Sequence, residues 1–271
     1  MRKIYKRTQM KLHFVRITFH ALFLVTALIL PARLFGQIPS CPAGTVEPPN
    51  GLVAWWPLDE AAGATTLSDR GPSGANNATP VPPILSGAPV GGFVGNALRF
   101  GNNSYAKVVN TNFNFGKTTD FSIDAWIKGG TGPIVGNFDG SSKLGYSLYV
   151  NHNHQVVFQM GRGFQVMTFT GPALTPNDWY FVAVTVSRHA ANSVTFYTGS
   201  NAPNLTPTAA GVLASNADAS STSPLMISKC TGNPNGCVTI DELEIFNREL
   251  SSTELGAIFN AKHKGKCLRN P

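Results

Sequence analysis

Short apolar segments separated by turn-forming residues recur along most of this chain, and they constrain its fold more than any other feature. In residues 120–128 the side chains alternate, with Phe121 on an apolar side and Trp126 on the other, a pattern that marks a half-buried strand. Residues 178–188 are apolar on both faces and predict a central, sandwiched strand. About a dozen such segments, with Gly- and Pro-rich turns and little helix, predict an all-β fold of two antiparallel sheets.

One helix is expected at the end of this region. Ser251 and Glu254 form the S-x-x-E pattern of a capping box. A narrow apolar stripe follows at Leu255, Ile258 and Phe259. We therefore predict one short helix after the last strand.

The first 36 residues have the composition of an export signal. Six basic residues and no acidic ones precede an apolar run of 14 residues at 17–30. A membrane-spanning helix needs about 20 residues, so the run suits a signal-peptide core, and a tilted membrane anchor is the alternative. We expect cleavage near Gly36, a secreted or cell-surface protein, and no membrane span after cleavage. The rest then divides into a Pro-rich linker (37–50), one domain (51–262) and a C-terminal tail (263–271).

The basic charge of the chain belongs mostly to this leader. Seven of the 21 Lys and Arg residues lie at or before Arg33, whereas none of the 14 Asp and Glu residues do. The remaining 14 basic residues therefore balance the 14 acidic ones. No stripe of basic residues interleaved with aromatics follows the leader, so we expect no nucleic acid among the partners.

All four cysteines follow the leader, and export predicts disulfide bonds. Cys230 and Cys237 flank the turn-rich sequence T-G-N-P-N-G, while Cys41 and Cys267 lie near the two ends of the exported chain. We predict the pairs Cys230–Cys237 and Cys41–Cys267. Zinc is the competing interpretation, but no C-x-x-C spacing supports it.

Residues 238–250, with the sequence V-T-I-D-E-L-E-I-F-N-R-E-L, predict a late strand that carries three carboxylates: Asp241, Glu242 and Glu244. Such a strand is compatible with catalysis, with a metal site or with a structural role. Glu242 and Glu244 share a strand face. In the structural interpretation they are bonded to Arg248 or to loop amides.

Several segments keep a recognisable order: G-L-V-A-W-W-P-L-D-E, S-D-R-G-P-S-G-A-N-N-A-T, G-N-A-L-R-F, D-F-S-I-D-A-W-I-K, D-W-Y-F-V-A-V-T-V, V-T-F-Y-T-G and I-D-E-L-E-I-F-N-R-E-L-S-S-T-E-L. Together they resemble the LamG-like jelly-roll domains of the concanavalin A-like lectin/glucanase superfamily, over roughly residues 51–260. The resemblance implies a two-sheet jelly roll with neighbouring termini, in agreement with the Cys41–Cys267 pair. It implies function only loosely, because this fold hosts lectins, glycosidases, adhesion modules and structural domains.

The glucanases of that superfamily carry E-x-D-x-x-E on a strand, which supplies the two carboxyl groups of a retaining glycosidase. The nearest match here has Thr239 in place of the first Glu, followed by Asp241 and Glu244. Because the nucleophile is missing, we expect no catalytic residue and a protein that is not an enzyme. A divergent glycan hydrolase is an alternative.

The resemblance also suggests calcium, because LamG-like domains often hold this ion, which takes six to eight oxygen ligands. Asp69 matches the family's early Asp motif, and Asp59 and Asp241 would join it if the first and last strands are neighbours. In the alternative interpretation Asp69 forms an Asx-turn and Asp59 ends a strand.

Sugar binding requires aromatic faces and planar polar groups on one sheet. The candidates are Trp126 beside Asp124, and Tyr149 and Gln159, which are expected to line the same sheet. The alternative places Trp126 in the core, because Trp is usually mostly buried. Trp179 lies in the central strand and is assigned to packing.

These observations predict a non-catalytic, secreted or cell-surface module that binds a glycan or an extracellular protein. A purely structural or adhesion module is the first alternative. Ligand choice would lie in the loops 59–95 and 199–223, which carry no recognisable motif.

Overall fold

The computed structural model describes residues 41–86, 88–200 and 204–267. They fall within one of the two units of the chain, residues 38–271. The expectations for the leader and its cleavage therefore lie outside the described residues. Within the described ranges no helix is long and apolar enough to cross a membrane.

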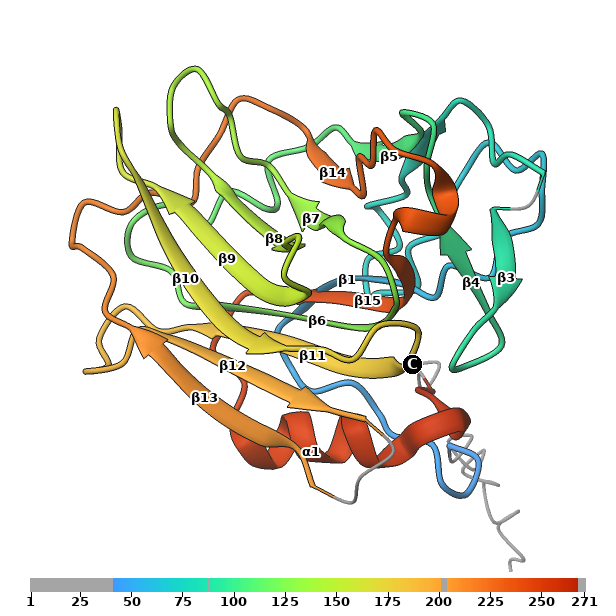
Figure 1. Ribbon diagram of the computed structural model, residues 1–271. Coiled ribbons are helices and arrows are strands. Elements are labelled where there is room, and N and C mark those ends of the chain that lie inside the picture. Colours follow the sequence, from blue (N-terminus) through green and yellow to red (C-terminus); the bar gives the residue numbers. More distant parts are fainter. Residues whose placement is uncertain (1–40, 87, 201–203, 268–271) are drawn as a thin grey trace, which may run out of the picture. The chain divides into compact units, whose positions relative to one another are not determined.

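Two antiparallel sheets form the fold, as the alternating segments predict (Figure 1). The eight-stranded sheet runs in the order β13–β12–β11–β6–β15–β4–β3, and β1 pairs with β15 beside this path. Its strands are β1 (Leu52–Trp56), β3 (Pro89–Gly91), β4 (Asn96–Arg99), β6 (Phe121–Lys128), β11 (Trp179–Val186), β12 (Val194–Gly199), β13 (Thr206–Gly211) and β15 (Thr239–Phe246).

The second sheet has seven strands in the order β10–β9–β8–β7–β14–β5–β2. All of its printed pairings are antiparallel, so hairpins and longer returns connect its strands. The strands are β2 (Thr79–Val81), β5 (Tyr105–Val108), β7 (Gly132–Gly136), β8 (Tyr146–Val150), β9 (Gln155–Gly161), β10 (Val166–Ala173) and β14 (Leu225–Ile227).

The main core contains apolar side chains from both sheets. From the eight-stranded sheet, β6 contributes Phe121 and Ile123, and from the other sheet β8 contributes Tyr146 and Leu148. The rings of Phe121 and Tyr146 have centroids 5.0 Å apart. Burying one such large side chain stabilises the folded state by roughly 1.5–3 kcal/mol, and the alternating pattern supplies such side chains from both sheets.

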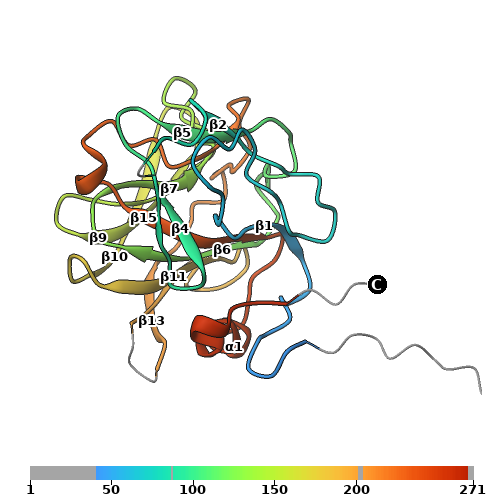
Figure 2. The same cartoon turned by 90° about the vertical axis from the view of Figure 1, so that its right-hand side faces the viewer.

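A second apolar cluster lies on the other face of the eight-stranded sheet. The helix α1 (Ser252–Ala261) buries Leu255, Ile258 and Phe259 there, against residues such as Trp126 and Phe181 of the sheet. Figures 1 and 2 show α1 on the side of this sheet that faces away from the seven-stranded sheet. The outer face of the seven-stranded sheet is therefore not covered by α1.

Short edge strands occur in both regions that were expected to be loops. β2 and β3 fall within residues 59–95, and β13 falls within 199–223. Each lies at one end of its sheet. Their sequences, TPV, PVG and TPTAAG, show no apolar alternation, because an edge strand is specified by pairing with its neighbour more than by burial.

The structure pairs Cys41 with Cys267 and Cys230 with Cys237, the two pairs predicted from the sequence. The first bond joins residues 226 positions apart, and the second closes a loop of sequence separation 7. The segments that were expected to be a linker and a tail are therefore attached to each other at the base of the domain.

Candidate functional site

The strand β15 carries the three acidic residues that the sequence analysis singled out, and all three are buried. A β-bulge between Asp241 and Glu244 shifts the pairing of β15 with β6. Ile240 and Leu243 belong to the core between the sheets. The extra residue of the bulge therefore leaves Asp241, Glu242 and Glu244 on the side away from that core.

Lys266 covers this side of β15. Its Nζ lies 2.6 Å from Oε2 of Glu242 and 3.3 Å from Oε2 of Glu244, and only 3% of its side chain is exposed. The indole Nε1–H of Trp55 donates to the same Glu242 oxygen at 3.0 Å. Val46 forms a parallel bridge with Lys266, which holds the lysine next to the long-range disulfide. Figure 2 shows the corresponding blue and red segments running together below the sheets.

Asp124 completes what we call the buried charge cluster, because it lies opposite Glu244 in the register of β6 and β15. Burial, with the neighbouring Glu244 charge, raises the pKa of Asp124 well above its ordinary value. Burial raises the pKa of Glu244 to about 7, although the Lys266 charge opposes it. The buried charge cluster consists of Asp124, Glu242, Glu244 and Lys266.

Burial lowers the pKa of Lys266 and the surrounding carboxylates raise it, with a net shift upward. The lysine therefore stays charged, and the adjacent Asp124 and Glu244 retain a proton between them near neutral pH. Both carboxyl groups are 0% exposed, whereas glycoside hydrolysis requires its carboxyl pair to flank a bound sugar. This geometry supports a structural role, in which Lys266 attaches the C-terminal segment to the sheet.

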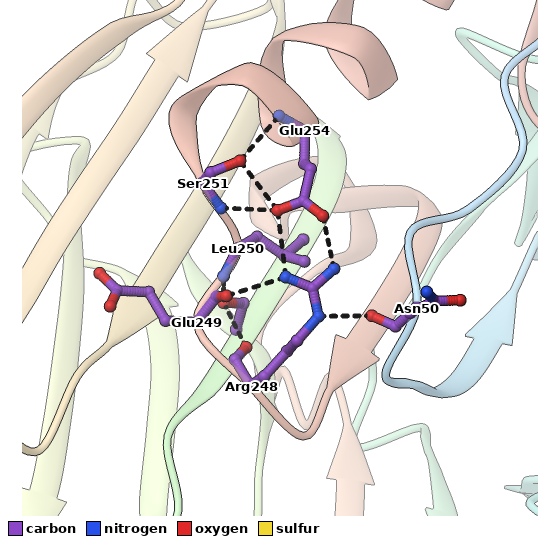
Figure 3. Close-up of polar contacts among 7 residues, drawn as sticks. Asn50, Arg248, Glu249, Leu250, Ser251 and Glu254 are labelled. Carbon is purple, nitrogen blue, oxygen red and sulfur yellow. Dashed lines mark hydrogen bonds and ion pairs between the residues drawn. The ribbon is translucent and has the colours of Figure 1, made fainter.

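The expectation that Arg248 pairs with the glutamates of β15 is wrong, because Lys266 occupies that position. Figure 3 shows the Arg248 guanidinium forked onto Glu254, with Nη1–Oε2 3.0 Å and Nη2–Oε1 2.5 Å. Arg248 Nε also donates to the Asn50 carbonyl at 2.7 Å. The bond from Arg248 lowers the pKa of Glu254 to about 2. Ser251 and Glu254 form the predicted capping box at the start of α1.

Asp69, a predicted calcium ligand, is a hydrogen-bond acceptor that organises its own loop. Its Oδ1 accepts the backbone N–H groups of Trp55 at 3.0 Å and Gly71 at 2.7 Å. Its Oδ2 accepts the backbone and side-chain N–H groups of Asn76, both at 3.0 Å. This is the Asx-turn alternative, extended by contacts to the first strand.

The other two predicted calcium ligands also face N–H donors. Asp59 Oδ1 accepts the N–H of Asn96 at 2.7 Å, and Asp241 Oδ2 accepts those of Phe93 and Val94 at 2.7 and 2.8 Å. Calcium needs a shell of oxygen ligands. Among the described residues no group of three His, Cys, Asp or Glu side chains is arranged to hold a metal ion. The three aspartates do not fit the calcium site that the resemblance implies.

The four predicted ligand-binding residues lie on two different sheets. Asp124 and Trp126 belong to β6 of the eight-stranded sheet, and Trp126 is 2% exposed and stacks on Phe93 with centroids 3.5 Å apart. Tyr149 and Gln159 belong to β8 and β9 of the other sheet. The expectation that all four line one sheet is wrong, because β6 and the pair β8 and β9 belong to different sheets. The outer face of β6 that carries Trp126 is also buried beneath α1.

Tyr149 and Gln159 lie on the outer side of the seven-stranded sheet, where both are half-buried. Ser147 stands directly opposite Gln159 in the pairing of β8 with β9. The intervening Leu148 and Phe158 point into the core, which confirms the period-two reading of these strands. We call the outward side chains of this sheet the open face. Its members include Tyr149, Gln159, Ser147, Thr168, Thr170, Met226 and Lys107.

The structure has a hollow that no pattern in the sequence predicts. Trp179, assigned to packing, is only half-buried and lines a cavity of about 330 Å³ together with His263 and Asn177. The ring of Phe93 meets Trp179 edge-on with centroids 6.2 Å apart. Because the lining residues come from five separate segments of the chain, no local sequence pattern signals the hollow.

A family model described as "Concanavalin A-like lectin/glucanases superfamily" matches residues 100–256. No curated protein sequence matches the chain. The match covers the segments from the end of β4 to the first turn of α1, and thus most strands of both sheets.

Three solved structures illustrate the similarity in fold. The binding domain of Paraclostridial Mosquitocidal Protein 1 is 18% identical with a TM-score of 0.57, and the match covers 78% of this chain and 52% of that one. The receptor binding domain of botulinum neurotoxin D is 13% identical (TM-score 0.51; 77% and 52%). Trypanosoma rangeli sialidase in complex with sialic acid is 20% identical (TM-score 0.52; 82% and 35%). The chain thus matches about half of each of the two binding domains and about a third of the sialidase, and at these identities the likeness shows the fold alone.

Proposed function

This chain belongs to the concanavalin A-like lectin/glucanase superfamily, and from that premise we propose that it is a non-catalytic extracellular module that binds a glycan on its open face. The observation that carries the proposal is the half-buried Tyr149 ring with Ser147 and Gln159 beside it on a sheet face that α1 does not cover.

The chemistry of these side chains suits a sugar. An aromatic ring offers a flat apolar surface to the C–H face of a pyranose, and its hydroxyl adds a polar contact. The Gln159 amide can donate and accept hydrogen bonds, and so can the Ser147 hydroxyl. Partial burial raises the pKa of Tyr149, so its hydroxyl remains a donor at physiological pH. A small number of polar groups that converge around an aromatic surface is typical of small-ligand sites.

Two further observations support a binding role outside the cell. Disulfide bonds persist in oxidising compartments, and this domain has two. Two of the structures with the same fold are named as a binding domain and a receptor binding domain. The non-catalytic part of the proposal is supported by Thr239 at the first Glu position of the glucanase motif and by the burial of Asp241 and Glu244.

A glycan array with the purified, oxidised protein tests this proposal. We expect saturable binding to a subset of glycans, and loss of that binding in Tyr149→Ala. Tyr197→Ala is the matched control, because Tyr197 is also half-buried but lies on the eight-stranded sheet. Each sample is run with calcium and with EDTA, and we expect the same result in both.

The alternatives predict other outcomes. A purely structural or adhesion module gives no saturable glycan signal, and that result would overturn the proposal. A divergent hydrolase would release reducing sugar from the bound glycans, which would refute its non-catalytic part. Equal binding by wild type and Tyr149→Ala would show that the open face is not the glycan-binding site.

A further inference from the structure

A second cavity, which no residue of the buried charge cluster lines, lies where the β4–β5 turn meets the disulfide-closed loop. It has a volume of about 230 Å³. Its lining contains one charged side chain, Arg99, and no acidic one. The other lining residues are Leu85, Ser86, Ala88, Gly101, Asn102, Ser104, Asn233 and Asn235.

Arg99 has no partner for its charge among the described residues. Its Nε is buried and makes no hydrogen bond, and none of the ion pairs in the described part of the chain includes it. Leaving a buried donor unsatisfied costs free energy, more so when the group is charged. A guanidinium offers five N–H donors in a planar fork that matches a carboxylate or sulfate group.

The cavity is built by a rigid frame. The N–H groups of Asn102 and Asn103 donate to the carbonyls of Gly232 and Cys230 at 2.9 and 3.1 Å. Within the turn, Ser104 Oγ bonds to Gly101 at both its N–H and its carbonyl. The Cys230–Cys237 disulfide closes the loop on the other side. A site held in place in this way loses little conformational entropy when a ligand binds.

Resting on the glycan-binding role proposed above, we infer that this cavity, which we call the oxyanion pocket, binds the carboxylate or sulfate group of an acidic sugar. Arg99 supplies the charge, and the side-chain amides of Asn102 and Asn235 supply neutral donors. Its volume lies below the 300–1,000 Å³ usual for drug-sized ligands, so the pocket accommodates one charged sugar residue of a longer chain.

The oxyanion pocket adjoins the start of β5, a strand of the seven-stranded sheet, through Ser104. Ser104, which lines the pocket, directly precedes β5, whose Lys107 points outward onto that face. On the loop side, Lys229 follows β14 by two residues and lies 5.7 Å from the Tyr105 ring centroid. Lys107 and Lys229 thus add positive charge beside the strand that leads out of the pocket.

Titration of the purified, oxidised full chain tests the inference. The ligands are glucuronate, glucose 6-sulfate, uncharged glucose and inorganic sulfate, and binding is followed by calorimetry or by shifts of backbone and Asn side-chain amides. We expect the acidic sugars to bind at least about tenfold more tightly than glucose. Arg99→Gln should reduce that affinity at least about tenfold, because charge-assisted hydrogen bonds are lost. Arg70→Gln removes the same charge at an exposed position outside the pocket and should bind like wild type.

Two more variants keep the test decisive if Arg99→Gln does not fold. Asn102 has φ 53°, which Gly adopts without strain, so Asn102→Gly removes only the side chain; Asn235→Ala removes the second amide. Each should weaken acidic-sugar binding about threefold or more. The inference is overturned if glucuronate and glucose 6-sulfate bind no better than glucose or inorganic sulfate, or if these variants and Arg99→Gln match wild type.

The two proposals fail separately. Glycans that bind through Tyr149 regardless of charge and of Arg99 would keep the open face and exclude the oxyanion pocket. Acidic monosaccharides that bind through Arg99, without any effect of Tyr149→Ala on glycan binding, would keep the pocket and exclude the open face.

Discussion

Replacing Lys266 by methionine removes the cation of the buried charge cluster while keeping most of the side chain's volume. Glu242 and Glu244 then lose a charge 2.6 and 3.3 Å from their oxygens, at a place where all three side chains are at most 3% exposed. Removing one partner of a buried ion pair costs about 3–5 kcal/mol, because the other charge is left uncompensated. We expect Lys266→Met to lower the free energy of unfolding by that amount at pH 7.

An independent route gives a similar magnitude and adds a pH dependence. An uncompensated buried glutamate can lose its charge by taking up a proton. For a carboxyl group with an ordinary pKa of about 4.3, the free energy of this protonation is about 4 kcal/mol at pH 7 but only about 1 kcal/mol at pH 5. In the variant, the folded state then holds a proton that the unfolded state has released. Its stability therefore falls further, relative to wild type, as the pH rises from 5 to 7.

Urea unfolding at pH 5 and pH 7, followed by tryptophan fluorescence, measures both effects. Lys264→Met is the control: this lysine is exposed, and its loss should change stability by no more than about 0.5 kcal/mol. The double variant with Glu242→Gln should recover part of the loss, because the amide carries no charge. A cost below about 1 kcal/mol at pH 7, or an equal cost at both pH values, would refute this account of the buried charge cluster.

Three further predictions concern the frame of the domain. Burial raises the pKa of Asp241 to about 8. The stability that its protonated carboxyl group contributes is therefore complete below about pH 4 and is lost as the pH rises through 8. Asp241→Asn should flatten this decline in the free energy of unfolding, measured with urea between pH 5 and 9. Serine replacement of the Cys41–Cys267 pair should cost more than the same change in the short-loop pair, about 5 against about 2.5 kcal/mol by loop entropy, and equal denaturant midpoints would contradict this. Trp126→Ala should cost about 3–5 kcal/mol in the same assay, with unchanged glycan specificity.

Local chemistry in the sequence was enough to predict several features correctly. The two-sheet sandwich follows from period-two alternation, because a strand buries one face whatever its partners are. The capping box depends on residues three positions apart, Ser251 and Glu254. The disulfide pairs follow from a tight loop and from neighbouring termini. Tyr149 and Gln159 lie on one sheet, but Trp126 and Asp124, which were expected beside them, lie on the other.

Tertiary structure decided the features that depend on which face is covered and on contacts between distant segments. The same alternation put Trp126 and Asp124 on a polar side, but α1 and the C-terminal segment bury that side. Lys266, 24 residues after Glu242 in the chain, could not be recognised as its partner from the sequence, because Arg248 is nearer to Glu242 along the chain. The pocket around Arg99 likewise forms only where a turn meets a distant loop. The alternating pattern is local, so it can be recognised within a single strand. The choice of partner for a buried charge depends instead on packing between segments that are far apart in the chain.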